Sequence, residues 1–489
     1  MLKEIKFKTW VKIFAVILVT LFIARPWIEK GSSHILPAGS KEYEIDIVDD
    51  SGYRVRLEKP ADRIISLYSA HTENLFSLGL DREIIGVGTS DIYPPAALDK
   101  KVFDYRSDPE KIISQKPDLV LIRPFIERNS PDFVNSLRRS GINVVSLYPE
   151  SFSEFDDYIM KLATLTGKEG TASKKLDEFH NELKSMGSTT SGIEDKVGVY
   201  FESSDRDYTT VTVDSMPSYA LQLAGGINIA GDVEPITEGS SIAAYGIENI
   251  LQKGKEIDVY VTQRGAMGGG GNTHSISIRP GFDSISAVKS GRIVEINQKI
   301  ISSPTFRFTK GVKELMRSFY PDLFDAIDPD AYGEEITRDE LAEILLKYTH
   351  SPIFVPSTSY YKDSGKDHYY GRLEDLGSDS SYFDAAETCL QRGYFEVFIE
   401  DDVEFFKPES SVTREEFAKM LYIIGNLKND NSIEISDLED VKNSRIAKSV
   451  VSNGLIQLES GNFLPEKSVS KNEIFAALET LQVILNDNM

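Results

Sequence analysis

Short apolar runs alternate with short amphipathic segments along most of the chain. A first series begins at Arg63 and places apolar runs at 64–67, 84–87, 119–122 and 143–147, with a helical pattern over 69–78. A second series begins at 197–201 and continues through 258–261 to 292–296. Strands that alternate with helices predict parallel sheets with both faces covered.

One sequence unit occurs in both series. Residues 108–122 and 246–261 each contain a glutamate near a helix start, a short amphipathic helix, a polar turn, an aspartate and an apolar run. The two glutamates are Glu110 and Glu248. The repeat predicts two similar lobes, with one acidic side chain at the matching place on each.

Residues 152–186 carry a helical pattern without strand signals. Leu176, Phe179, Leu183 and Met186 fall on one helical face. This pattern predicts a long helix that joins the two lobes.

Beyond about residue 328, one short motif recurs three times. A Thr or Ser is followed three residues later by Glu, ahead of an apolar helical pattern, at Thr337/Glu340, Thr413/Glu416 and Ser470/Glu473. This spacing is typical of a capping box, in which the hydroxyl and the glutamate satisfy free amides at a helix start. Similar segments precede the last two motifs, so the region is predicted to hold internal repeats, the first reduced to its last helix.

These patterns predict an α/β fold of two Rossmann-like lobes with parallel sheets, joined by a long helix and followed by a mainly α-helical repeat domain. The expected domains are a signal or anchor helix and linker (1–40), an N-terminal lobe (41–150), a connecting helix (151–190), a C-terminal lobe (191–327) and helical repeats (328–489).

The charge of the chain narrows the range of partners. The 489 residues carry a formal net charge of -23. Such acidity argues against a nucleic-acid partner, because phosphate binding needs clustered Lys and Arg, and it also fits an ordinary solvated surface. Cys389 is the only cysteine, so no internal disulfide and no lipoprotein cysteine after the signal are available.

The N-terminus has the opposite charge. Lys3, Lys6, Lys8 and Lys12 precede an apolar run over 13–24. A positive segment followed by an apolar one predicts export. The segment is either a cleaved signal peptide or an uncleaved transmembrane anchor. The anchor is favoured because no small-x-small cleavage site follows closely after the apolar run. The chain beyond this segment is expected to be extracytoplasmic, at the cell membrane or cell-wall surface.

Ligands of open α/β lobes bind beyond the carboxyl ends of the strands. Arg123 and Arg264 follow the two copied strands, so one arginine is expected on each side of a cleft, where its fork suits carboxylates; a surface ion pair is the alternative for each. The other ligand-binding residues expected at this stage are Tyr68, Ser69, Tyr93, Glu202, His274 and Arg307. Glu73 lies in the first helix and is interpreted as structural.

No enzymatic or metal-binding pattern is present. The chain lacks a Gly-x-Ser-x-Gly elbow and a His-Glu-x-x-His motif, and its six histidines have no paired ligand spacing. No catalytic residue, resident metal or cofactor is therefore expected.

Ordered motifs over residues 60–325 resemble the class III substrate-binding proteins of ABC importers, which capture cobalamin, ferric siderophores and haem. The motifs are 63–67 with Thr72-Glu73, 86–88 with Tyr93-Pro94-Pro95, the Glu110 unit with Lys116-Pro117-Asp118, and 287–292. The resemblance implies that a single helix joins the lobes, that Glu110 and Glu248 dock on arginines of the permease, and that Tyr105 is a ligand-contacting aromatic. Stabilisation of a helix N-terminus is the alternative role for each glutamate.

The C-terminal repeats resemble S-layer homology modules. That family binds secondary cell-wall polymer, and the resemblance would give this role to Arg338, Arg414 and Lys471. The first module is incomplete and the third contains Lys and Asn within the motif, so well-capped helices of a small domain remain an alternative.

The leading hypothesis is a receptor at the cell envelope, an ABC transporter substrate-binding protein for a ferric siderophore, and after that cobalamin or haem. The alternative is a structural or adhesive envelope protein, anchored to wall polymer, whose binding fold has degenerated.

Overall fold

The computed structural model describes residues 44–237, 240–265, 271–354, 373–377, 380–428 and 433–487. The expected signal or anchor segment and most of the glycine-rich stretch 268–271 lie outside these residues. Within the described ranges, no helix combines the length and the apolar character needed to cross a membrane.

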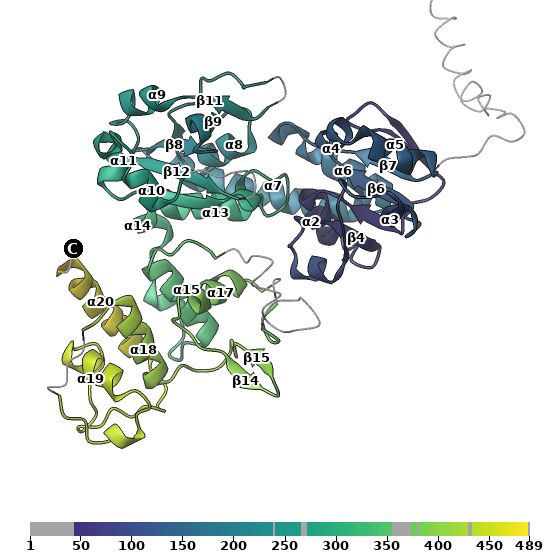
Figure 1. Ribbon diagram of the computed structural model, residues 1–489. Coiled ribbons are helices and arrows are strands. Elements are labelled where there is room, and N and C mark those ends of the chain that lie inside the picture. The colour runs from purple at the N-terminus through teal and green to yellow at the C-terminus, as the bar shows by residue number, and fades with distance from the viewer. Residues whose placement is uncertain are drawn as a thin grey trace, which may run out of the picture. The chain divides into compact units, whose positions relative to one another are not determined.

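The first lobe is built on a five-stranded parallel sheet (Figure 1). Its strand order is β5 (Lys101–Phe103), β4 (Ile84–Gly88), β3 (Ile64–Ser66), β6 (Leu119–Ile122) and β7 (Asn143–Ser146). In β6, Leu119 and Leu121 enter one hydrophobic core while Val120 and Ile122 enter another. Successive side chains of a strand point to opposite faces, so a sheet covered on both faces requires the continuous apolar run.

Helices cover this sheet, and a small hairpin precedes it. The helices are α2 (Ser69–Ser77), α3 (Glu110–Ile113), α4 (Pro124–Asn129) and α5 (Pro131–Arg139). The antiparallel hairpin of β1 (Ile45–Val48) and β2 (Arg54–Leu57) lies at the start of the lobe. The sequence did not predict this hairpin.

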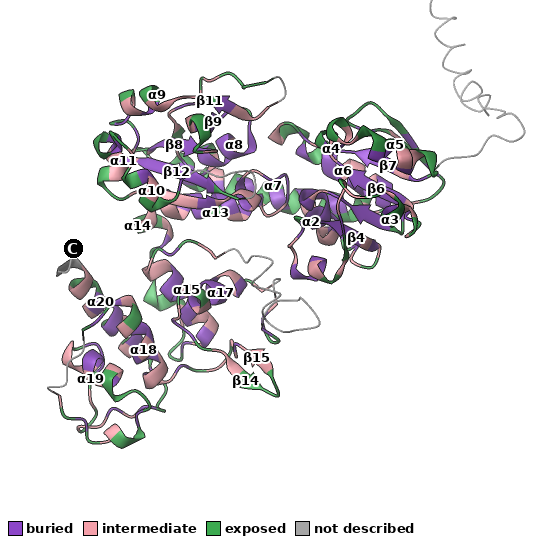
Figure 2. Ribbon diagram, in the orientation of Figure 1, coloured by how far each residue is buried: buried purple, intermediate pink, exposed green. Residues whose placement is uncertain are grey.

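The second lobe repeats the arrangement. Its parallel sheet has the order β10 (Ile227–Asn228), β8 (Gly198–Glu202), β12 (Val259–Arg264) and β13 (Ile293–Asn297). The unit of α9 (Ile247–Gln252) and β12 occupies the place that α3 and β6 occupy in the first lobe, with one edge strand beyond it. The predicted duplication is confirmed, and the buried strands of both lobes are visible in Figure 2.

Further elements complete the second lobe. They are the antiparallel pair β9 (Thr209–Val211) and β11 (Ile242–Ala244), and the helices α8 (Met216–Leu223), α10 (Thr273–Ser277), α11 (Ser286–Lys289), α12 (Gln298–Ile301), α13 (Phe308–Phe319) and α14 (Pro321–Phe324).

Two helices occupy the segment that was expected to form one connecting helix: the first packs on α2 and β1 of the first lobe, and the second joins the lobes. α6 (Phe155–Thr166) ends at Gly167, which adopts a left-handed conformation with φ of 68°. A glycine takes this conformation without the steric cost of a side chain and ends the helix. α7 (Glu169–Ser191) then packs against α6 and, in the second lobe, against α8 and α13.

The C-terminal region contains the predicted repeats. Its helices are α15 (Arg338–Tyr348), α17 (Phe383–Gln391), α18 (Arg414–Ile424), α19 (Ser444–Ser452) and α20 (Lys471–Asp487), with the hairpin of β14 (Phe398–Glu400) and β15 (Val403–Phe405). The amides of Thr337, Thr413 and Ser470 each donate to the carboxylate three residues on, at 3.0 Å. The three capping boxes are therefore confirmed.

Three equivalent contacts, which we call joints, link α15, α18 and α20 into a ring. In the first, Arg338 donates to the Phe406 carbonyl and to Glu416, at 2.7 and 2.6 Å. In the second, Arg414 donates to the Phe463 carbonyl at 2.7 Å and to Glu473.

Lys471 forms the third joint and closes the ring. Its side chain donates to the Tyr332 carbonyl at 3.0 Å, and its amide donates to the Glu334 carbonyl at 3.2 Å. The segment before α15 thus takes the place that the segments before α18 and α20 take in the other joints.

The ring changes the interpretation of its basic residues. The side chains of Arg338 and Arg414 are only 0% and 1% exposed, so the surface role implied by the S-layer resemblance does not fit them. Their guanidinium groups are used within the protein, where a planar fork can satisfy several acceptors at once.

Arg414→Ala is expected to lower the free energy of unfolding of the C-terminal region by about 3 kcal/mol, because it removes a buried cation and leaves the Phe463 and Gln457 carbonyls without their donor. Urea unfolding measures the change. Lys419→Ala on the same helix is the matched control: its ion pair with the exposed Glu396 is at the surface, and the loss should stay below about 1 kcal/mol. Equal losses in the two variants would contradict a structural role for Arg414.

Candidate functional site

A cavity of about 310 Å³ lies between the two lobes. Residues that come after each of the five strands of the first sheet line it. Beginning with the residues after β3, these are Leu67–Ser69, Thr89–Ser90, Tyr105–Arg106, Arg123 and Tyr148–Glu150. The second lobe contributes Ser203, Gln263, Lys299, Ser302 and Ser303, among others. The cavity is therefore at the carboxyl ends of the strands, where open α/β sheets bind ligands.

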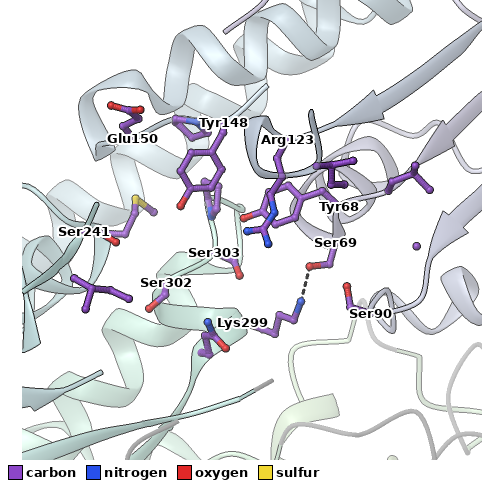
Figure 3. Close-up of a pocket in the computed structure, with 18 of the residues that line it drawn as sticks. Tyr68, Ser69, Ser90, Arg123, Tyr148, Glu150, Ser241, Lys299, Ser302 and Ser303 are labelled. Atoms are coloured by element: carbon purple, nitrogen blue, oxygen red, sulfur yellow. Dashed lines mark hydrogen bonds between the residues drawn. The ribbon is translucent and has the colours of Figure 1, made fainter. Parts of the chain in front are cut away.

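Aromatic rings form one wall of the cavity (Figure 3). The Tyr68 ring packs edge-on against His71, with centroids 5.0 Å apart, and lies 6.1 Å from the Tyr148 ring. The Arg123 guanidinium carbon lies 5.1 Å from the Tyr68 centroid and 4.8 Å from that of Phe125. These contacts hold a cation against aromatic faces at the cavity surface.

A buried histidine supports this wall. His71 Nε2 donates to the Ile122 carbonyl at 3.0 Å, and Nδ1 accepts from the Tyr158 hydroxyl at 2.8 Å. Burial lowers the pKa of His71 to about 4, because the charged ring would lose its hydration. Burial also raises the pKa of Tyr68 and of Tyr148, so both phenols are protonated at neutral pH.

Lys299 lies at the floor of the cavity, and the sequence interpretation missed it. Its ammonium donates to the Ser69 hydroxyl across the two lobes. Lys299 comes after β13, as Arg123 comes after β6. The expectation that ligands bind beyond the carboxyl ends of strands therefore also covers Lys299. It covers Tyr148 as well, which comes after β7.

Of the nine expected ligand-binding residues, four line the cavity: Tyr68, Ser69, Tyr105 and Arg123. The others, Tyr93, Glu202, Arg264, His274 and Arg307, are placed outside its lining by the structure.

Arg307 and Tyr93 belong to a buried contact between the lobes. Arg307 makes two hydrogen bonds to Glu73, at 2.7 and 2.8 Å, and its guanidinium carbon lies 3.7 Å from the Tyr93 ring centroid. The side chain of Arg307 is only 12% exposed, and that of Glu73 only 5%. Glu73 is thus structural, as expected, and Arg307 is its partner.

Glu202 is buried in the second lobe. Its carboxylate accepts from Arg279, from the Tyr260 hydroxyl at 2.5 Å and from the Gly271 amide at 2.6 Å. All of its acceptor capacity is directed to the interior, so it is not available to a ligand in the cavity.

Arg264 does not mirror Arg123. It is the last residue of β12 and lies 3.4 Å from Glu295, whereas Arg123 lies beyond the end of β6. Because side chains alternate along a strand, Gln263 faces the cavity and Arg264 faces away from it. His274, on α10, is exposed and also lies away from the cavity.

Glu110 and Glu248 are exposed, and each lies in the first turn of a short helix, α3 or α9. Both are accessible to a partner. Among the described residues, no group of three or more His, Cys, Asp or Glu is arranged to hold a metal ion.

The two lobes, the cavity between them and its polar lining define a solute-binding protein. A family model for periplasmic binding proteins matches residues 64–300. The chain is 30% identical over 294 residues to the uncharacterized ABC transporter substrate-binding lipoprotein YvrC of Bacillus subtilis, covering 58% of this chain and 87% of that protein. The chain therefore belongs to the periplasmic binding protein family, and it is a transport component and not an enzyme.

Other similar proteins include a vitamin B12-binding protein of Vibrio cholerae, 26% identical over 259 residues, or 52% of this chain and 88% of that one. A solved Staphylococcus epidermidis structure, described as a possible iron-binding periplasmic solute-binding protein, is 28% identical with a TM-score of 0.47. It covers 54% of this chain and 100% of that chain.

Acid is expected to destabilise the first lobe through His71. Because the folded-state pKa is lowered from 6.5 to about 4, the unfolded state binds the proton first, and about 3 kcal/mol of stability present above pH 6.5 is lost as the pH falls to 4. Urea unfolding between pH 4 and 7 should show a shallower acid loss for His71→Gln. The variant His274→Gln, at an exposed position on α10, is the control and should keep the wild-type slope. An unchanged slope in His71→Gln would contradict this assignment.

Proposed function

We propose that this chain is an extracytoplasmic receptor that captures a chelated metal or tetrapyrrole and delivers it to the permease of an ABC importer. The observation that carries the proposal is the cavity between two similar α/β lobes, lined by Tyr68, Arg123 and Tyr148 from the carboxyl ends of the strands. A ferric siderophore is the favoured ligand, followed by cobalamin or haem. Relatives named vitamin B12-binding proteins keep cobalamin among these candidates.

The chemistry of the lining favours a complete chelate over a bare ion. Ferric iron prefers anionic oxygen ligands, but burial raises the pKa of Tyr68 and Tyr148, which disfavours their phenolate forms. Glu150 is the one carboxylate among the residues that line the cavity. The metal would therefore keep the ligands of its own chelator, and the protein would recognise the outside of the complex.

Glu110 and Glu248 are our proposed docking residues for the permease. They occupy equivalent positions on α3 and α9, both are exposed, and neither lines the cavity. Two charges at matching places on the lobes would orient the encounter and increase its rate more than they would add affinity.

We further propose that the protein is held at the cell envelope. The positive and apolar N-terminal pattern supports export and membrane attachment. Binding of wall polymer by the C-terminal ring stays a proposal, and it would depend on surfaces other than the buried Arg338 and Arg414.

A cognate chelate is expected to raise the melting temperature, because a ligand that binds only the folded state stabilises it by about 2.7 kcal/mol at one hundred times its dissociation constant. A thermal-shift panel of ferric siderophores, haemin and corrinoids measures this effect. The iron-free siderophores and the free metal salts are the controls and should shift the melting temperature less. A panel that leaves the melting temperature unmoved throughout would count against the receptor function and favour a degenerate binding fold.

Reversing Glu110 and Glu248 to lysine is expected to abolish uptake of the ligand by cells while leaving its affinity for the isolated protein unchanged. The variants remove the docking charges without touching the cavity. Glu169→Lys, at the exposed start of α7, is a matched reversal that should keep uptake. Loss of ligand affinity in the double variant would show that the two glutamates serve binding and not docking.

A further inference from the structure

Two cations from opposite lobes face the same part of the cavity. Arg123 comes after β6 of the first lobe, and Lys299 belongs to α12, directly after β13 of the second lobe. Figure 3 shows both side chains directed to the space beside Ser69. The second-lobe cation of this cavity is thus Lys299, in the role that the sequence assigned to Arg264.

Arg123 has unused hydrogen-bonding capacity. Tyr68 and Phe125 hold its guanidinium through aromatic faces, and these contacts use none of its N–H donors. Within the described residues, its side chain forms no ion pair and no hydrogen bond with an acceptor. A half-buried guanidinium in this state is stabilised by an incoming oxyanion, and its fork matches the two oxygens of a carboxylate.

Lys299 also has unused hydrogen-bond donors. One N–H is donated to Ser69, which leaves two donors. The nearby carboxylates are engaged elsewhere: Glu73 binds Arg307 through both oxygens, and Asp91 accepts from Thr72 and from the Gly88 amide. Burial lowers the pKa of Lys299 while Glu73 and Asp91 oppose that shift, so an anion in the cavity would restore an interaction that water no longer provides.

The remaining charges of the lining do not cancel this pair. Arg106 is committed to Asp104 at 2.9 Å. Glu150 is exposed and lies beyond Tyr148 from Arg123 in Figure 3. Among the hydroxyls of the lining, Ser302 donates to Gln263 and Ser90 donates to Asp91 at 3.3 Å. Among the residues that the structure describes, Ser69 only accepts, from Lys299, and its own O–H adds a neutral donor beside the two cations.

We propose that the ligand carries a carboxylate that binds between Arg123 and Lys299, with Ser69 as a third donor. This inference rests on the proposed function and narrows its ligand class to anionic chelates and carboxylate-bearing tetrapyrroles. The carboxylate bridges the two lobes, because one of its cations belongs to each. A chelate of net positive charge would meet two like charges at this place and is rejected.

Isothermal titration of the full chain with ferric citrate, haemin and ferrioxamine B tests the inference. The first two probes carry carboxylates, and the third is a cationic hydroxamate complex. The wild-type protein is expected to bind at least one carboxylate probe at least tenfold more tightly than ferrioxamine B. Arg123→Gln and Lys299→Met should each weaken that binding at least tenfold and reduce its dependence on salt.

Two exposed cations provide matched controls. Arg128→Gln lies on α4, the helix that begins directly after Arg123, and Lys289→Met lies on the second lobe; both should keep the wild-type affinity. Circular dichroism and melting temperatures check that all four variants fold, and because the two test residues lie on different lobes, either variant alone can decide the question.

Tighter binding of ferrioxamine B, or unchanged carboxylate affinity in either test variant that folds, would overturn the inference and leave the receptor function standing. Cyanocobalamin, which has no carboxylate, separates the remaining cases. If it alone binds, the carboxylate site is wrong and the receptor function holds; if none of the four probes binds, both are contradicted.

Discussion

The geometry of the cavity depends on a buried ion pair between the lobes. Glu73 belongs to the first lobe and Arg307 to the second, and each is almost completely withdrawn from solvent. Separating a buried pair leaves two charges without compensation, which is more costly than keeping them together. Asn74 adds a second link, because its amide donates to the Pro304 carbonyl at 2.9 Å. These contacts and α7, which packs against elements of both lobes, set the spacing of the cavity walls.

The duplicated unit places different side chains at the cavity in the two lobes. In the first, the strand ends at Ile122 and Arg123 lies beyond it, at the cavity. In the second, the strand continues through Arg264, and the alternation of side chains places Gln263 at the cavity. Arg123 lies five residues after Asp118, whereas Arg264 lies six residues after Asp258, so Gln263 is the counterpart of Arg123. The cation of the second lobe then comes from the neighbouring strand.

The sequence predicted the lobes better than the site. All of β6 and the first half of β12, Val259–Val261, are apolar because each supplies two cores, so their pattern is visible without tertiary information. The hairpin of β1 and β2 was missed because its strands are short and carry several exposed positions. The end of α6 at Gly167 was also missed. It depends on the backbone conformation of one residue, and the apolar spacing on both sides of it is that of a helix.

The lining of the cavity was predicted in part, because only some of its residues follow strands closely in the sequence. Tyr68, Ser69 and Arg123 come directly after strands and could be found by that rule. Arg307 and Glu202 also looked like ligand contacts, yet their charges are used by partners that only the folded chain brings near: Glu73 lies 234 positions from Arg307, and Arg279 lies 77 positions from Glu202. Pairing over such distances has no local signal in the sequence.

The closed ring of the C-terminal region has a consequence for how that region unfolds. Repeats stacked in a line fray from their ends, because each end repeat has a neighbour on one side only. Here the Lys471 joint returns the third helix to the segment before the first, and no repeat is terminal. The three repeats are then expected to lose their structure together in one transition, and the joint that lacks an arginine and an acidic partner is where the ring would first open.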